Sequence, residues 1–122
     1  MKRAIAAFAL VCLPAHAAPG YWSGNELVEH YRAFKRVESG NQPGAIDYAG
    51  ASAYIGYLRA VYEFTNTVEP AYVCVPDSKG IQDVGFAVGL YMELNKSELS
   101  TPAAILVRKA LWQAFPCGPK LD

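Results

Sequence analysis

Residues 23–36 read SGNELVEHYRAFKR, and this stretch decides the fold class because it carries a full set of helix signals. Ser23 and Glu26, three residues apart, form the capping-box pattern that opens many helices. Leu27, Tyr31 and Phe34 then recur at helical spacing. Acidic residues near the start and basic residues near the end suit the helix dipole. The pattern predicts a helix that ends at ESGNQPG, residues 38–44.

A second helical segment is predicted from about residue 43 to residue 66. Its spacing shows no period of two, which a strand would require. We expect its buried stripe to comprise Ile46, Gly50, Ala53, Tyr57, Ala60 and Phe64. Pro70 ends this region, and AYVCVPD at residues 71–77 favours a short extended piece.

Two further helices are predicted in the C-terminal half. The third begins at Asp77 or Ser78, either of which can cap a helix, and runs to about Leu94. The fourth begins with Thr101 as cap and Pro102 in the first helical position, and it ends at FPCGP, residues 115–119. The expected apolar stripes are Ile81, Val84, Val88 and Tyr91 in the third helix, and Ala103, Val107, Ala110, Leu111 and Ala114 in the fourth.

Gly85 and Gly89 stand four residues apart in the third helix, where each lowers helix propensity by about 1 kcal/mol. We expect them to allow close packing against another helix or another chain. Together the four segments predict a small all-α, single-domain bundle with one core, covering residues 18–122.

The N-terminus has the pattern of a cleaved secretory signal, residues 1–17. Lys2 and Arg3 precede an apolar run at residues 4–13, and a small-x-small motif ends at Ala17. The run is too short to span a bilayer. We expect cleavage after Ala17 and a periplasmic location; the alternative is a core helix.

Cleavage would remove Cys12 and leave Cys74 and Cys117. An oxidising compartment favours a disulfide between them. The alternative is that Cys74 is a thiolate nucleophile, which needs a basic partner. His30 is the single histidine left after Ala17, and we expect it at the solvent edge of the first helix.

The remaining chain offers few groups for catalysis. With 11 basic and 11 acidic residues overall, loss of Lys2 and Arg3 leaves a net charge near −2, which does not suit nucleic acid. We predict no catalytic residue, metal site or cofactor, because zinc-ligand clusters, phosphate-binding glycine loops and nucleophile elbows are missing. We also predict no membrane contact, because the sequence after Ala17 has neither a long apolar segment nor a basic amphipathic stretch. The chain has eight tyrosines and two tryptophans, of which Tyr72 and Tyr91 are the candidate protein-binding anchors.

Three segments together resemble the Tai/Rap family of type VI secretion immunity proteins. They are YWSGNELVEHY at residues 21–31, YIGYLRAVYE at residues 54–63, and residues 73–117 from VCVPDSKGIQ to AFPC. The resemblance implies a periplasmic protein that binds and inhibits a papain-like peptidoglycan amidase effector, often as a homodimer, and performs no chemistry itself. The family usually has a further cysteine pair, where this chain has Tyr31 and Tyr54. We expect these two tyrosines to pack together instead.

We expect the effector to contact the start of the third helix and the polar loop that follows it. The candidate residues are Asp77, Ser78, Gln82, Asp83, Asn95, Lys96, Ser97 and Glu98. For Asp77 and Asp83 the alternative is helix capping. Two other functions stay open from the residues alone: an acid-stress periplasmic chaperone, and a periplasmic enzyme that uses carboxylates.

Overall fold

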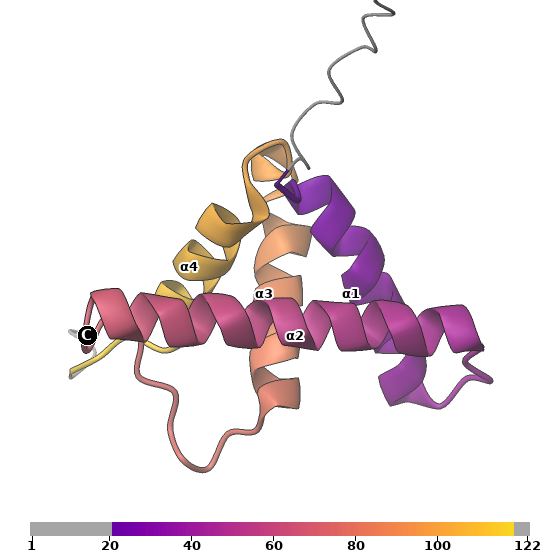
Figure 1. Ribbon diagram of the computed structural model, residues 1–122, viewed down its shortest axis with the longest axis horizontal. Coiled ribbons are helices and arrows are strands. Elements are labelled where there is room, and N and C mark those ends of the chain that lie inside the picture. Colours follow the sequence, from indigo (N-terminus) through magenta and orange to yellow (C-terminus); the bar gives the residue numbers. More distant parts are fainter. Residues whose placement is uncertain (1–20, 119–122) are drawn as a thin grey trace, which may run out of the picture.

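The computed structural model describes residues 21–118, which fold into four α-helices and one short 3₁₀ helix (Figure 1). The helices are α1 (Gly24–Ser39), α2 (Ala45–Val68), α3 (Ile81–Leu94) and α4 (Ala103–Ala114), and η1 (Lys96–Glu98) lies between α3 and α4. The long α2 helix crosses the other three and packs against each of them (Figure 1). The predicted all-α bundle is therefore confirmed.

The α1 helix follows its sequence signals closely. The Ser23 N–H donates to Glu26 Oε2 at 2.7 Å, which confirms the predicted capping box. Gly40, with φ +68°, ends the helix and donates its N–H to the Val37 carbonyl. Leu27, Tyr31 and Phe34 are all buried, as their spacing predicted.

The buried face of α2 was predicted wrongly. Ile46 is 87% exposed and Phe64 is 69% exposed, whereas the core side of the helix carries Ala51, Tyr54, Leu58 and Thr65. Because α2 has apolar residues almost all round, hydrophobic spacing alone could not fix its rotation. The large Tyr54 and Leu58 side chains fill the core, while the predicted stripe relied on small residues.

The starts of α3 and α4 also differ from prediction. The α3 helix begins at Ile81, and Gly80 is its N-cap residue, the role that was expected of Asp77 or Ser78. The Gly80 N–H donates to Asp83 Oδ2 at 2.8 Å. The α4 helix begins at Ala103, whose N–H donates to the Trp22 carbonyl at 2.6 Å. Thr101 does not cap α4; its hydroxyl donates to the Glu98 carbonyl at 2.7 Å.

The glycines of α3 pack closely against α1, as predicted. A Cβ atom on Gly85 would lie 3.0 Å from Phe34 Cζ, and one on Gly89 would overlap the Tyr31 ring. The Tyr31 and Tyr54 ring centroids lie 5.5 Å apart, which confirms the expected packing of these two side chains. The Tyr54 hydroxyl donates to the Gly85 carbonyl at 2.7 Å, so α1, α2 and α3 meet at this cluster.

Candidate partner-binding loops

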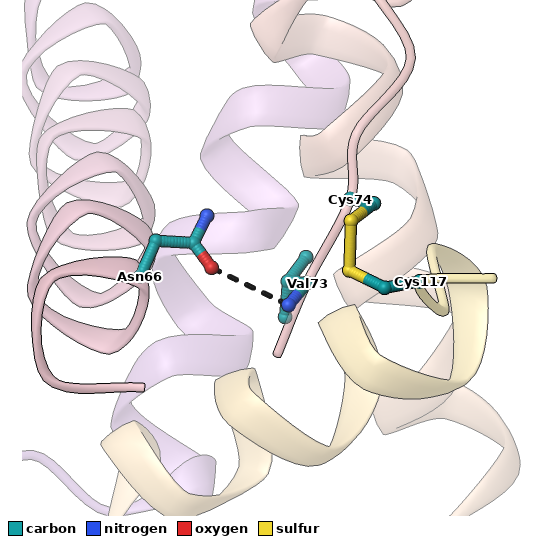
Figure 2. Close-up of a disulfide and its surroundings, with 4 residues drawn as sticks. All are labelled: Asn66, Val73, Cys74 and Cys117. Atoms are coloured by element: carbon teal, nitrogen blue, oxygen red, sulfur yellow. Dashed lines mark hydrogen bonds between the residues drawn. A yellow bond between two sulfur atoms is a disulfide. The ribbon is translucent and has the colours of Figure 1, made fainter. Parts of the chain in front are cut away.

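A disulfide joins the loop between α2 and α3 to the chain that follows α4 (Figure 2). Cys74 and Cys117 are bonded, with their Cα atoms 4.9 Å apart, as the sequence predicted. The bond also rules out the alternative that Cys74 is a nucleophile, since neither cysteine has a free thiol.

Two hydrogen bonds hold the base of the same loop, one to α2 and one to the residue that follows α4. Val73 is 3% exposed, and its N–H donates to Asn66 Oδ1 of α2 at 3.3 Å (Figure 2). The Cys74 N–H donates to the Phe115 carbonyl at 2.9 Å. Residues 75–80, here called the anchored loop, therefore leave a fixed base and project away from the helices (Figure 1).

Arg108 of α4 fastens the segment just before this base. Its Nη2 atom lies 2.9 Å from Glu69 Oε1, and its guanidinium carbon lies 4.8 Å from the centroid of the Tyr72 ring. Tyr72 was a candidate partner anchor, but it is half-buried and engaged with Arg108.

Two of the four candidates near the start of α3 occupy the tip of the anchored loop. Asp77 and Ser78 are exposed in a turn, which the Lys79 N–H closes on the Pro76 carbonyl at 2.9 Å. Gln82 is exposed on the first turn of α3. Asp83 accepts a hydrogen bond from the Gly80 N–H and so caps α3, which is the alternative role expected for this residue.

A hollow of about 380 Å³ lies beside the anchored loop. One wall is the loop with Asp77, and the other is α2 with Arg59, Tyr62 and Glu63. The sequence did not single out these α2 residues, because they come next to the loop only through the packing of the chain. Their shared spacing on one side of α2 was the available signal.

The remaining four candidates form a hydrogen-bonded turn after α3. The Asn95 side-chain amide donates to the Tyr91 carbonyl at 2.8 Å, and the Glu98 N–H donates to the Asn95 carbonyl at 2.9 Å. Asn95 and Glu98 thus build the turn. Lys96 and Ser97 are its exposed residues.

Glu98 connects this turn to both neighbouring helices. Its Oε2 atom accepts from Lys109 Nζ at 2.9 Å and from the Tyr91 hydroxyl at 3.2 Å. The Lys109 hydrogen bond lowers the pKa of Glu98, with the Tyr91 hydrogen bond adding to it. Burial raises the pKa of Tyr91, and the Glu98 charge raises it further. Tyr91, the second candidate anchor, is therefore also engaged internally.

The eight candidate residues do not form one compact site. Asp77 and Ser78 precede α3, whereas Asn95–Glu98 follow it, so the 14 residues of α3 separate the two groups. At 1.5 Å per residue this separation is about 20 Å. Contact of either group with an effector stays a prediction.

Among residues 21–118, no group of three or more His, Cys, Asp or Glu side chains is placed to hold a metal ion. Within the same residues, no helix has the length and apolar character to cross a membrane. His30 stacks on Trp22, with ring centroids 4.3 Å apart.

A family described as Rap1a immunity proteins matches residues 23–117, which include all four α-helices and both bonded cysteines. Neither a curated protein nor a solved structure matches the chain. The family match covers most of the sequence and reaches from the α1 capping box to the disulfide. The chain therefore belongs to the Rap1a immunity protein family.

Proposed function

We propose that this protein is a periplasmic immunity protein that binds a peptidoglycan amidase delivered by a type VI secretion system. The amidase is of the papain-like Cys/His class, and its inhibition protects the producing cell. Membership of the immunity family supports an effector as the partner. The observation that carries the proposal furthest is the anchored loop, which joins an exposed tip to a base fixed by the disulfide and by Val73.

Inhibition by this loop needs occupation of a cleft and no chemistry. A loop that is already ordered loses little conformational entropy when a partner binds it. Asp77 and Ser78 lie at the tip, where they would meet the walls of the amidase cleft. Lys96 and Ser97 at the far end of α3 would make a second, separate contact.

Export is part of the proposal. The expected signal, residues 1–17, lies outside the described residues. The Cys74–Cys117 bond supports an oxidising compartment, because disulfides persist there and are rare in the cytosol.

We further propose that two copies associate through α3. Phe86, Leu90 and Leu94 lie at successive turns of its outer face and are 43%, 54% and 74% exposed. Antiparallel pairing of two α3 helices would bury both stripes. It would also place the acidic start of one helix, Asp83, near the basic residue that follows the other, Lys96.

A binding and inhibition assay tests the proposed function. The protein, purified from cells that express the full chain, is titrated against the amidase encoded beside its gene, with release of peptidoglycan fragments as the second readout. We expect tight binding and loss of amidase activity, weakened by Asp77→Arg with Ser78→Arg and by scrambling residues 95–98. If the wild-type protein leaves the amidase fully active, the proposal is wrong.

A further inference from the structure

The hollow between α2 and the anchored loop has a rim of mixed charge. Arg59 and Glu63 lie one helical turn apart on α2, and Asp77 and Lys79 face them from the loop side. The apolar part of the lining comes from Val75, Pro76, Ile81 and Val84. Opposite charges thus surround one small hollow.

Most other charged side chains of residues 21–118 already have a partner within the fold. The ion pairs are Arg32–Glu29, Lys35–Glu93, Arg36–Asp47, Arg108–Glu69 and Lys109–Glu98. Glu26 and Asp83 cap helices. Within the described residues, the charged side chains left without an ion pair or a capping bond are Glu38, Arg59, Glu63, Asp77, Lys79 and Lys96. Four of these six surround the hollow.

We propose that this hollow is the specificity contact for the cognate effector. It would receive a polar loop of the amidase that presents an acidic side chain to Arg59 and Lys79 and a basic side chain to Glu63 and Asp77. This inference rests on the proposed function and adds the residues that select one effector among related amidases.

The physical reason is that, among residues 21–118, the rim charges have no ion pair to break on binding. A partner whose charges complement the rim is attracted to it without first breaking an ion pair. A partner that presents the same charges in reverse order would face like charges on both walls. Both walls are also preorganised, since one is a helix and the other leaves the disulfide-fixed base. A small ligand fits the hollow less well. The buried side-chain atoms without a hydrogen-bond partner in the described chain, Thr65 Oγ1 and Arg108 Nε, belong to residues outside its lining.

Charge reversal tests the inference. Arg59→Glu and Lys79→Glu are each measured for amidase affinity beside Glu38→Lys, a charge-reversal control at the end of α1 whose side chain has no ion pair among residues 21–118. Thermal unfolding checks that each variant is folded, and Arg59→Gln serves as a milder variant. We expect each hollow variant to bind about tenfold or more weakly, and the control to bind like the wild-type protein.

Salt dependence gives an independent readout. Raising the salt from about 0.1 M to about 1 M shortens the screening length from about 10 Å to about 3 Å. Affinity of the wild-type protein should therefore fall more steeply with salt than that of Arg59→Glu.

Each result has a defined meaning. If the wild-type protein binds the amidase and the folded hollow variants bind equally well, the specificity contact lies elsewhere and only this inference fails. If a peptidoglycan stem peptide alone binds the wild-type protein and not Arg59→Glu, the hollow is a ligand site and the inference is also wrong. If the wild-type protein binds no amidase, the proposed function fails first and the inference fails with it.

Discussion

At the scale of single residues, the Tyr31 ring leaves room only for a glycine at position 89. A Cβ atom there would overlap that ring, which is enclosed by Tyr54 and Phe34 and cannot move aside easily. Gly56 on α2 is the opposite case, since a Cβ atom there would meet nothing within 4 Å. The same substitution should therefore have opposite effects at the two glycines.

We predict that Gly89→Ala lowers the free energy of unfolding by about 1–3 kcal/mol, because overpacking outweighs the gain in helix propensity. Gly56→Ala should raise it by about 0.5–1 kcal/mol, because only the gain in propensity remains. Urea denaturation of both variants measures the two changes. A stabilised Gly89→Ala protein would mean that the Tyr31 ring is less firmly held than the structure indicates.

A second prediction at the residue scale concerns the ionisation of the Tyr54 hydroxyl. Burial raises the pKa of its hydroxyl well above the ordinary value near 10, and the nearby Tyr31 and Glu93 add to this shift. Because the folded-state pKa is the higher one, the contribution of Tyr54 to stability is complete below about pH 10 and declines as the pH rises further. Tyrosinate absorbance of wild-type and Tyr54→Phe proteins should be equal while both are folded. An extra wild-type component should appear only as the protein unfolds.

At the scale of elements, the sequence predicted α1 well because its capping box and apolar stripe agree. The start of α3 was missed because Gly80 has no side chain to mark it, and the capping oxygen comes from Asp83 inside the helix. The rotation of α2 was missed because tertiary packing of Tyr54 and Leu58, rather than periodicity, decides it. Arg59 and Glu63 were missed because their spacing places them on one side of α2, but no local pattern shows that this side lies next to the anchored loop.

The disulfide contributes to the free energy of unfolding, whereas the hydrogen bonds at the loop base hold the folded conformation of the anchored loop. This difference gives a prediction at the scale of elements. Cys74→Ser with Cys117→Ser should lower the free energy of unfolding by about 4 kcal/mol on the chain-entropy model, because a long loop is no longer closed in the unfolded chain. The folded loop base should persist through Val73 and the Cys74 N–H bond to Phe115.

The amidase affinity of this double variant should change much less than its stability, provided that it is measured well below its unfolding temperature. A variant that is fully folded yet no longer binds would place part of the binding function in the disulfide itself.

At the scale of the whole molecule, the four helices enclose one core but leave the outer side of α3 uncovered. Large apolar side chains are exposed elsewhere too, including Ile46 and Phe64 on α2. What distinguishes α3 is the order of its three exposed side chains along one face, at positions 86, 90 and 94. A surface of this kind is typical of protein interfaces, and its position between the two candidate loops makes it relevant to both.

Leu90 lies at the middle of that stripe, so an antiparallel pair of α3 helices would place it next to its own copy. We predict that Leu90→Asp converts a dimer into a folded monomer, because two carboxylates would meet in an apolar contact. Phe64→Asp is the matched control, since it introduces the same charge at a more exposed position on α2 and should remain dimeric. Sedimentation velocity of the three proteins measures the change, with circular dichroism to confirm the helical fold. A wild-type protein that sediments as a monomer, or a Leu90→Asp protein that stays dimeric, would show that α3 is not the dimer interface.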